Sequence, residues 1–256
     1  MLKIATWNVN SIRSRLERLL AFLERHHPDI LCLQELKTPE ETYPFEELDQ
    51  AGYHSAVFGQ KTYNGVAILS RVKPNVILRG MEDGVEDPQS RLIAAEVSGV
   101  TVISAYFPNG GTVGSEKWDY KLGWMNRLKN YLETHFKNGI PLLLCGDTNI
   151  AIDDRDVANP GEWAESVLCH PDGRRGLQDI IDWGFVDVFG EKHPAGGIYS
   201  WWDYRRLAFP RDDGLRIDHI FAASEMAKKC TSATIDRDER KGSKPSDHAP
   251  VIAEFS

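Results

Sequence analysis

The segment best suited to chemistry starts where an apolar strand ends, at Asp147 and Asn149. The apolar run Leu142–Cys145 stands between Pro141 and Gly146, which is typical of a short buried strand. Asp147 and Asn149 follow two residues apart, so in an extended segment their side chains face the same side. A carboxylate and an amide at the end of a buried strand are costly unless they meet a metal ion, a substrate or each other. A strand followed by an Asx-turn is the alternative interpretation of this segment alone.

The same arrangement, a polar residue at the edge of an apolar strand, recurs along the chain. The further instances are Asn8, Glu35, Tyr106, Asp218, and Asp247 with His248. A single polar residue at a strand end is explained by a turn. Several of them, from distant parts of the chain, predict that their side chains converge on one site. Carboxylate and amide oxygens suit Mg²⁺ or Mn²⁺ rather than zinc, because clustered thiolates and histidines are missing. A site of this kind activates water or stabilises phosphoryl oxygens, so the sequence predicts metal-assisted phosphodiester hydrolysis.

Each candidate residue also has a simpler structural interpretation. Glu35 alone is typical of a surface or helix-capping acid, and Tyr106 of a core aromatic with a hydrated hydroxyl. Asp247 and His248 form a loop salt bridge, or else His248, beside strand-end acids, serves as a general acid/base or an electrophile. The aromatic segment 199–205 either belongs to the core or stacks on bases and sugars with help from nearby arginines. Its members and neighbours are Trp201, Trp202, Tyr204, Arg205, Arg206 and Arg211.

The apolar pattern also predicts the elements that position these residues. Leu2–Trp7 alternates like a strand and leads into Asn8. Ser11 can cap a helix that Pro28 closes, with apolar residues at spacings of three and four. The next buried strand ends just before Glu35. If these two strands are parallel neighbours joined by a right-handed crossover, Asn8 and Glu35 lie at one edge of a sheet.

The rest of the chain alternates short strands with a few helices. The pattern predicts hairpins over 57–69 and 91–105, a helix over 122–136, an irregular polar segment over 153–176, a helix over 177–183, and strands over 215–221 and 251–255. These elements predict an α/β fold: a four-layer α/β sandwich with two packed mixed β-sheets flanked by helices. No repeat or linker divides the sequence, so we expect a single domain over residues 1–256.

Composition narrows the class of protein. The 256 residues carry a net charge of −8, which argues against coating nucleic acid through bulk positive charge. A local basic groove, or a cation between the acids and a phosphate, is still compatible with that charge. Apolar runs are too short to span a bilayer and the chain opens directly on a strand, so we expect a cytoplasmic protein with no membrane partner. The four cysteines show no CxxC spacing, which disfavours a disulfide framework or a zinc site.

Six ordered motifs carry a resemblance to a known family. They are Thr6-Trp7-Asn8-Val9-Asn10, Leu33-Gln34-Glu35, Tyr106-Phe107-Pro108-Asn109, Gly146-Asp147-Thr148-Asn149, Gly214-Leu215-Arg216-Ile217-Asp218 and Lys244-Pro245-Ser246-Asp247-His248-Ala249-Pro250. Together they resemble the exonuclease III family of abasic-site endonucleases, within the endonuclease/exonuclease/phosphatase superfamily. The match spans residues 2–255. Any one motif is weak, but the six in order are highly specific.

The resemblance implies the fold and the activity. The implied fold is again a four-layer α/β sandwich, which uses Mg²⁺, with Mn²⁺ as a substitute, to cut the phosphodiester 5′ to an abasic site. Related activities are 3′→5′ exonuclease on duplex DNA and removal of blocking groups from 3′ ends. The implied substrate is therefore duplex DNA with abasic sites or blocked 3′ ends. We expect a monomer that acts on DNA in the cytoplasm, at the nucleoid.

By position in the motifs, the resemblance also assigns roles around the metal ion and the attacking water. Glu35 would hold the metal ion, with Asn8 and Asp247 near it. Asp147 would orient or deprotonate the water. Asn149 would hold the water and the phosphate.

Further roles implied by the resemblance concern the phosphate and the DNA. His248, oriented by Asp218, would stabilise the negative charge that develops on the scissile phosphate. Tyr106 would contact the phosphate or assist the leaving group. An apolar slot would accept a flipped-out, baseless sugar, since extrusion costs least where no base is stacked. The residues matching that slot are Trp201, Leu215 and Ile217.

The sequence departs from the family pattern in the loop after Asn109. This loop is rich in glycine and short of basic residues, so Lys117 and Lys121 would have to supply DNA-backbone contacts beside Asn109. The balance between incision and exonuclease activity therefore stays open. A 3′→5′ exonuclease with little abasic-site incision, and a hydrolase of another phosphoester such as a phosphoinositide or RNA, are the alternatives. A catalytically inactive DNA-binding module is disfavoured, because Glu35, Asp147, Asn149, Asp218 and His248 are all present.

Overall fold

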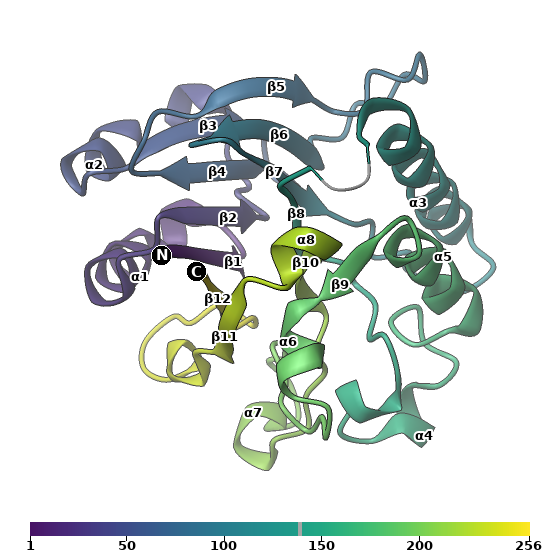
Figure 1. Cartoon of the computed structure of the whole chain (residues 1–256). Coiled ribbons are helices and arrows are strands. Elements are labelled where there is room, and N and C mark those ends of the chain that lie inside the picture. The colour runs from purple at the N-terminus through teal and green to yellow at the C-terminus, as the bar shows by residue number, and fades with distance from the viewer. Residues whose placement is uncertain (138–139) are drawn as a thin grey trace.

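The computed structural model of the chain describes residues 1–137 and 140–256, which contain two six-stranded sheets (Figure 1). The first sheet has the order β11 (Cys230–Ile235), β12 (Val251–Phe255), β1 (Leu2–Asn8), β2 (Ile30–Gln34), β4 (Val66–Ser70), β3 (His54–Phe58). The second has the order β5 (Asn75–Arg79), β6 (Leu92–Val97), β7 (Val100–Tyr106), β8 (Leu142–Asp147), β10 (Asp218–Ala223), β9 (Phe185–Asp187). Each sheet is mixed, because β1–β2 and β7–β8 are parallel pairs among antiparallel neighbours.

Helices cover the outer faces of the two sheets (Figure 1). Helices α1 (Ile12–His26) and α2 (Phe45–Gln50) pack on the first sheet, and α3 (Glu116–His135) and α5 (Pro171–Ile181) on the second. The shorter segments are η1 (Glu40–Thr42), η2 (Asp154–Asp156), α4 (Pro160–Trp163), α6 (Val188–Lys192), α7 (Ala208–Arg211), α8 (Ser224–Ala227) and η3 (Arg237–Arg240). The predicted four-layer α/β sandwich is confirmed. Within the described residues, no helix is long and apolar enough to cross a membrane.

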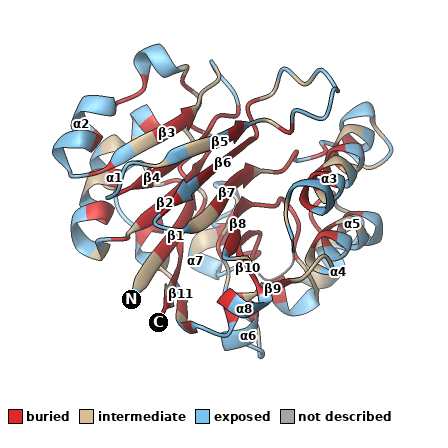
Figure 2. Cartoon of the chain, turned by 45° about the horizontal axis from the view of Figure 1, so that its top comes forward, coloured by how far each residue is buried: buried red, intermediate tan, exposed pale blue. Residues whose placement is uncertain are grey.

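The central strands are buried on both faces because alternate side chains enter different apolar layers. In β8, Leu143 and Cys145 face the layer between the two sheets, whereas Leu142 and Leu144 face α3 and α5. A strand covered on both sides needs apolar residues at every position, which explains its continuous apolar run. Figure 2 shows the result, with buried strands at the centre and the exposed surface on the outer helices.

One predicted helix begins earlier in the structure, and another begins as predicted but without its predicted cap. Helix α3 begins well before the predicted 122–136, because Ser115 caps it by accepting a hydrogen bond from the Trp118 amide at 3.3 Å. Helix α1 ends before Pro28 as expected, but Ser11 has φ 86° and makes no side-chain capping bond. The predicted Ser11 cap is therefore wrong. The turn into α1 is instead held by backbone bonds from Ser11 and Ile12 to the segment after β2.

Differences also occur in the second half of the chain. Helix α5 begins inside the segment predicted to be irregular, where Pro171 occupies the first turn and the His170 ring accepts from the Asp172 amide. The aromatic segment 199–205 forms no regular strand, and Trp201 makes only single bridges. The hairpins β3–β4 and β6–β7 are antiparallel, as predicted.

Strand directions determine which residues meet at one edge of the two sheets. Tyr106 of β7 lies opposite Asp147 at the end of the parallel strand β8. Strand β10 is antiparallel to β8 and starts at Asp218, opposite Asp147. Asp218 therefore begins its strand, which corrects the predicted strand 215–221. Because an antiparallel strand starts where its neighbour ends, Asp218 still reaches the same edge. His248 precedes β12, the antiparallel neighbour of β1. The start of β12 lies beside the end of β1, so His248 reaches the same edge.

Gly146 allows β7 and β8 to approach closely next to this edge. A Cβ atom at Gly146, which has φ 152°, would lie 1.8 Å from the Ala105 carbonyl oxygen. No side chain fits at that distance, so a glycine must precede Asp147.

Candidate active site

The candidate active site lies where β1, β2, β7 and β8 end and where β10 and β12 begin. Both sheets contribute to it, since β1, β2 and β12 belong to the first sheet and β7, β8 and β10 to the second. The structure brings together six residues that the sequence predicts for the site: Asn8, Glu35, Tyr106, Asp147, Asp218 and His248.

One amide group links the two sheets at this site. Asn8 Nδ2 donates to Glu35 Oε1 and to Asp147 Oδ2, at 2.9 Å in each case. Asn8 Oδ1 accepts from the Asn10 backbone amide at 3.0 Å, which fixes the orientation of the amide group. Tyr106 donates its hydroxyl to the same Glu35 Oε1 at 2.9 Å. Asn8 thus turns its nitrogen towards both carboxylates and orients them, and its place beside the metal ion stays a prediction.

Glu35 also makes an ion pair that sequence analysis missed. Lys37 Nζ lies 2.8 Å from Glu35 Oε2. Burial opposes ionisation of Glu35, but Lys37 and the Asn8 hydrogen bond outweigh it and hold its pKa below the ordinary value. Burial and the nearby carboxylates of Glu35 and Asp147 raise the pKa of Tyr106 well above its ordinary value. The Tyr106 phenol therefore remains a hydrogen-bond donor at neutral pH.

Asp147 has the opposite electrostatic environment from Glu35. Its carboxylate is buried and accepts a hydrogen bond from the Asn149 backbone amide at Oδ1, 2.8 Å away. Asn109 Nδ2 donates to Asn149 Oδ1 at 2.9 Å, so a second loop supports Asn149. Burial raises the pKa of Asp147 to about 7, although His248 acts in the opposite direction. Asp147 is therefore poised between its protonated and ionised forms near neutral pH.

His248 is held by a second buried carboxylate. Its Nδ1 lies 2.8 Å from Asp218 Oδ2, an oxygen that also accepts from Ser200 Oγ at 2.7 Å. His248 Nε2 is 3.7 Å from Asp147 Oδ2. Burial opposes protonation of His248, but the carboxylates of Asp218 and Asp147 raise its pKa to about 10. A positively charged imidazole therefore faces the centre of the site at neutral pH.

Asp247 lies beside this centre, on the Trp201 side. Asp247 Oδ1 accepts from Asn10 Nδ2 at 2.9 Å, and Oδ2 accepts from Trp201 Nε1 at 3.1 Å. Asn10 Oδ1 in turn accepts from Lys37 Nζ at 2.6 Å. Asn10 thus connects Asp247 to the Lys37–Glu35 ion pair, and the structure does not bring Asp247 and Glu35 into direct contact.

The centre of the site has the donor set of a divalent cation. One ligand atom each of Glu35, Asp147 and His248 lies within 4.8 Å of the others. Because His248 is charged and bonded to Asp218, the carboxylates of Glu35 and Asp147 are the donors for an ion. Carboxylate oxygens suit a hard cation, and a cation would stabilise the ionised form of Asp147 that burial disfavours. The residues present therefore fit a divalent metal ion.

The residues predicted to line a sugar slot lie together behind Trp201. Leu215 and Ile217 are 0% and 1% exposed and belong to one apolar cluster with the partly buried Trp201. Trp201 also packs edge-on against Trp163, with ring centroids 5.7 Å apart. The structure thus groups the three predicted residues, but of these only Trp201 has surface that a ligand can touch without displacing neighbours.

The predicted DNA contact of Lys121 is wrong for this structure. The Lys121 side chain is 0% exposed and lies inside the protein. The physical reason is its place on α3, in line with the buried Trp118 and Met125, so that it faces the core. Lys117, one turn earlier, is exposed and lines the same groove as Tyr106.

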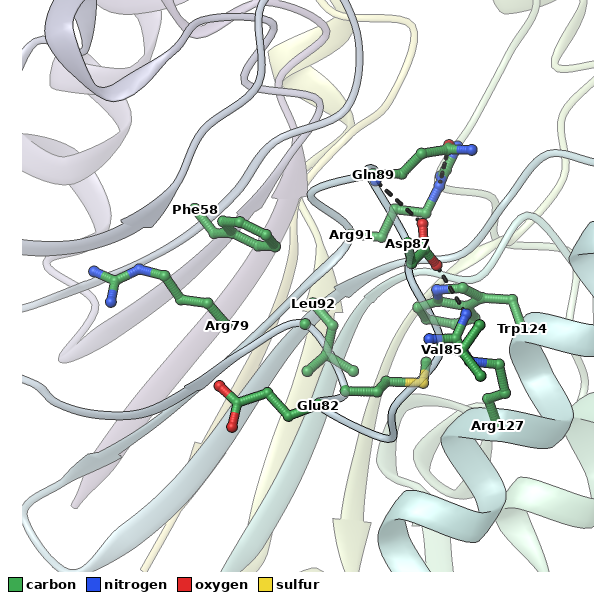
Figure 3. Close-up of a pocket in the computed structure, with 12 residues that line it drawn as sticks. Phe58, Arg79, Glu82, Val85, Asp87, Gln89, Arg91, Leu92, Trp124 and Arg127 are labelled. Atoms are coloured by element: carbon green, nitrogen blue, oxygen red, sulfur yellow. Dashed lines mark hydrogen bonds and ion pairs between the residues drawn. The ribbon is translucent and has the colours of Figure 1, made fainter.

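Sequence analysis also missed an arginine next to Tyr106. The Arg91 guanidinium lies 4.8 Å from the centre of the Tyr106 ring and donates to the Tyr106 carbonyl at 3.1 Å. Gln89 accepts from Arg91 Nε at 2.8 Å, and Asp87 accepts from Arg127 of α3 at 2.9 Å (Figure 3). The segment before β6 is therefore fixed to α3. Only the position of Arg91 at the start of a predicted strand could have indicated a role.

The fold and the site together define a class of protein. A two-sheet α/β sandwich that presents a cation-binding carboxylate pair and a charged histidine at one edge is suited to metal-assisted phosphoester hydrolysis. Residues 5–248 match the endonuclease/exonuclease/phosphatase family, and the chain belongs to this family. The resemblance identified from the six motifs is confirmed.

Individual relatives match over the whole chain. An exodeoxyribonuclease III from Haemophilus influenzae is 38% identical, over 99% of this chain and 100% of the relative. The structure of an AP endonuclease from Archaeoglobus fulgidus superimposes with a TM-score of 0.97 at 41% identity, covering 100% of both chains. The structure of a 3′ phosphatase from Neisseria, bound to a product DNA hairpin, superimposes with a TM-score of 0.96 at 42% identity, again over 100% of both chains.

Proposed function

We propose that this protein is a Mg²⁺-dependent DNA repair nuclease that hydrolyses the phosphodiester 5′ to abasic sites. It also acts as a 3′→5′ exonuclease and removes blocking groups from 3′ ends of duplex DNA. The observation that carries the proposal is the convergence of Glu35, Asp147 and His248, whose ligand atoms lie within 4.8 Å of one another. The full-length similarity to an exodeoxyribonuclease III and to an AP endonuclease supports the DNA substrate. We expect a monomer that acts on DNA in the cytoplasm.

Asp147 and Asn149 act on the attacking water. A carboxylate with a pKa of about 7 is partly ionised at neutral pH. Its ionised form is basic enough to accept a proton from the attacking water. The Asn149 backbone amide fixes Asp147 Oδ1 and Asn8 Nδ2 fixes Oδ2, so the carboxylate keeps one orientation. Asn149, supported by Asn109, helps to hold the water and the phosphate.

His248, Asp218 and Tyr106 act on the phosphate. Asp218 holds Nδ1 of the charged imidazole and leaves Nε2–H to donate to a phosphate oxygen. Donation from a buried cation stabilises the extra negative charge of the pentacoordinate transition state. The neutral phenol of Tyr106 has one O–H, which it donates to Glu35 in this structure and would turn to the phosphate or to the leaving oxygen when DNA is bound.

Glu35 is the principal residue for holding the metal ion. Asn8 and Tyr106 fix its Oε1, and the ionised carboxylate has the charge that the ion requires. Asn8 lies beside this carboxylate, and Asn10 holds Asp247 near it. Bound Mg²⁺, or Mn²⁺ as a substitute, polarises the phosphate and offsets the repulsion between it and the carboxylates.

Trp201 is the contact for the baseless sugar. It is the partly exposed member of the cluster that contains Leu215 and Ile217, and its indole nitrogen is fixed by Asp247. A flat aromatic surface backed by an apolar cluster accepts a deoxyribose more readily where no base has to be accommodated.

The test is a duplex labelled at its 5′ end that carries one abasic-site analogue, incubated with the protein in Mg²⁺ and, separately, in EDTA. A single Mg²⁺-dependent cut on the 5′ side of the analogue is the expected result. A second duplex with a 3′-phosphate tests 3′-end cleaning. Absence of cleavage in both duplexes would contradict the proposal, and phosphoinositides and RNA would then be tested as substrates.

A second candidate, a 3′-end nuclease with little abasic-site incision, is favoured by two observations. The 3′ phosphatase from Neisseria matches as well as the AP endonuclease, and Leu215 and Ile217 have almost no accessible surface. This candidate predicts a ladder of products shortened from the 3′ end, without the single cut at the analogue.

A further inference from the structure

Lys121 of α3 is a cation buried inside the protein, close behind the candidate active site. Its ammonium group donates to three backbone carbonyl oxygens: Asn109 at 3.1 Å, Asn149 at 2.8 Å and Val167 at 2.7 Å. None of the three acceptors is a carboxylate. An ammonium group has three N–H donors, so these carbonyls match its hydrogen-bonding capacity.

The three carbonyls belong to segments that are separate in the sequence, and the Lys121 ammonium bonds to all three. Asn109 lies in the loop after β7, Asn149 in the loop after β8, and Val167 between α4 and α5. The Asn149 backbone amide donates to Asp147, and its side chain accepts from Asn109. Asn149 also has a left-handed backbone with φ 51°, a conformation that asparagine adopts more readily than most other non-glycine residues.

Neighbouring residues pack closely on the Lys121 side chain. The Lys121 ammonium lies 5.6 Å from the centre of the Trp118 ring. A Cβ atom at Gly110, where φ is +94°, would lie 2.9 Å from Lys121 Cδ, so the glycine-rich loop packs directly on the lysine stem. Burying a cation without a counter-ion is expensive, and burial lowers the pKa of Lys121 to about 7. An apolar residue at this position would avoid that cost but would leave three carbonyls unpaired.

We propose that Lys121 is a positioning residue for the nuclease reaction: it fixes the backbones of Asn109 and Asn149, which hold the water-activating Asp147, and does not contact DNA. This inference rests on the proposed function. Lys117, exposed one turn earlier in the groove with Tyr106 and Asn109, is instead the lysine of α3 that contacts the DNA backbone.

The experiment compares Lys121→Met and Lys121→Gln with Lys117→Met as the matched control. Each protein is assayed on the abasic duplex in Mg²⁺, and kcat is expressed per folded molecule, with folding measured by circular dichroism. Lys121→Met should lower kcat by about 10- to 100-fold, the loss expected when reacting groups are misplaced, with KM unchanged. Lys121→Gln keeps an N–H donor and should lie between Lys121→Met and wild type.

The salt dependence of DNA binding separates positioning from contact. Loss of one phosphate contact reduces the slope of log affinity against log salt by about 1. Lys117→Met should show that reduction together with a higher KM and a retained kcat. Lys121→Met should keep the wild-type slope. A reduced slope and raised KM in Lys121→Met would identify a DNA contact and overturn the proposal.

A double-mutant cycle tests whether Lys121 acts through Asn149. Lys121→Met should cost less in kcat when it is introduced into Asn149→Ala than into wild type, because Asn149→Ala already removes the side chain that Lys121 positions through the Asn149 backbone. Independent losses would overturn the proposal, as would a wild-type kcat per folded molecule or a failure of both Lys121 variants to fold. In the last case the contacts serve the fold alone. Wild-type protein without nuclease activity would contradict the proposed function instead, so the two failures are distinguishable.

Discussion

Glu35 and Asp147 are two carboxylates joined by the same amide group, yet their environments push their pKa values in opposite directions. Glu35 lies 2.8 Å from the Lys37 ammonium, in the half of the site formed by β2 and partly open to water. Asp147 is enclosed at the end of β8, and the cation that faces it, His248, is shared with Asp218. The charge of Glu35 is therefore compensated by its own lysine, whereas Asp147 has only a cation that it shares with Asp218.

The difference indicates how the two groups divide the chemistry. A carboxylate that stays ionised is suited to holding a metal ion, and one with a pKa near neutrality is suited to exchanging protons. Two acids with different environments can therefore serve one reaction in different roles. The division depends on Lys37 and on the enclosure of Asp147, which can be changed separately.

Replacing Asp147 tests the proton-accepting half and should have the largest effect. Asp147→Asn keeps the shape of the side chain and removes its basicity. We expect kcat to fall by about 10²- to 10⁴-fold, the usual contribution of a general base, with binding of abasic duplex close to wild type. Single-turnover cleavage and fluorescence anisotropy measure the two quantities. Asp179→Asn, on the exposed face of α5, is the control and should retain full activity. Cleavage by Asp147→Asn close to the wild-type rate would remove Asp147 from this role.

Replacing Glu35 tests the metal-holding half. Glu35→Gln should weaken binding of Mn²⁺ by at least about 10-fold, because an ionised oxygen donor is replaced by a neutral amide. Calorimetric titration with Mn²⁺ measures this without relying on turnover, and cleavage should recover in part at high Mg²⁺. Asp247→Asn is the comparison variant and should weaken binding less, since Asn10 and Trp201 occupy its oxygens. An equal loss in both variants would place Asp247 and Glu35 in one metal site.

The raised pKa of Asp147 also predicts how metal-free stability depends on pH. Its pKa rises from 3.8 to about 7 on folding, so between these values the folded chain keeps a proton that the unfolded chain loses. The contribution of this group is fully present below pH 4 and is lost as pH rises to 7. In EDTA, the melting temperature of Asp147→Asn should therefore exceed that of wild type by more at pH 8 than at pH 4.5. In a chain of this size, each kcal/mol of change in the free energy of unfolding shifts the melting temperature by about 2–4 °C. A pH-independent difference would mean that Asp147 is ionised in the folded state at both values.

The sequence predicts the fold well because the relevant signals are local. Continuous apolar runs such as Leu142–Cys145 indicate strands covered on both faces, and the structure places them at the centre of two sheets. The sequence does not predict which end of its strand Asp218 occupies, because a short apolar run has the same pattern in both directions. Its position at the start of β10 depends on the pairing with β8, which is a tertiary property.

The site residues follow the same division between local and tertiary signals. The motifs identify Glu35 and Asp147, but the ion pair of Lys37 arises from the left-handed backbone of Glu35 and Lys37, with φ 51° and 53°, which no pattern reveals. Lys121 did carry a signal. It lies in the apolar row of α3 with Trp118, Met125 and Leu128. A lysine is rarely buried unless its ammonium group has partners, so a lysine in such a row indicates buried hydrogen-bond acceptors.

Removing Lys37 is the smallest change and tests whether compensation, rather than geometry, separates the two carboxylates. The ammonium competes with a metal ion for Glu35 Oε2, so Lys37→Gln should tighten Mn²⁺ binding. Both partners keep some exposure, so the expected gain is only about 2- to 5-fold, the range of partly exposed ion pairs. Lys73→Gln removes the same charge from an exposed site outside the candidate active site and controls for net charge. Weaker binding in Lys37→Gln would mean that Lys37 orients Glu35, and the difference between Glu35 and Asp147 would then arise from enclosure alone.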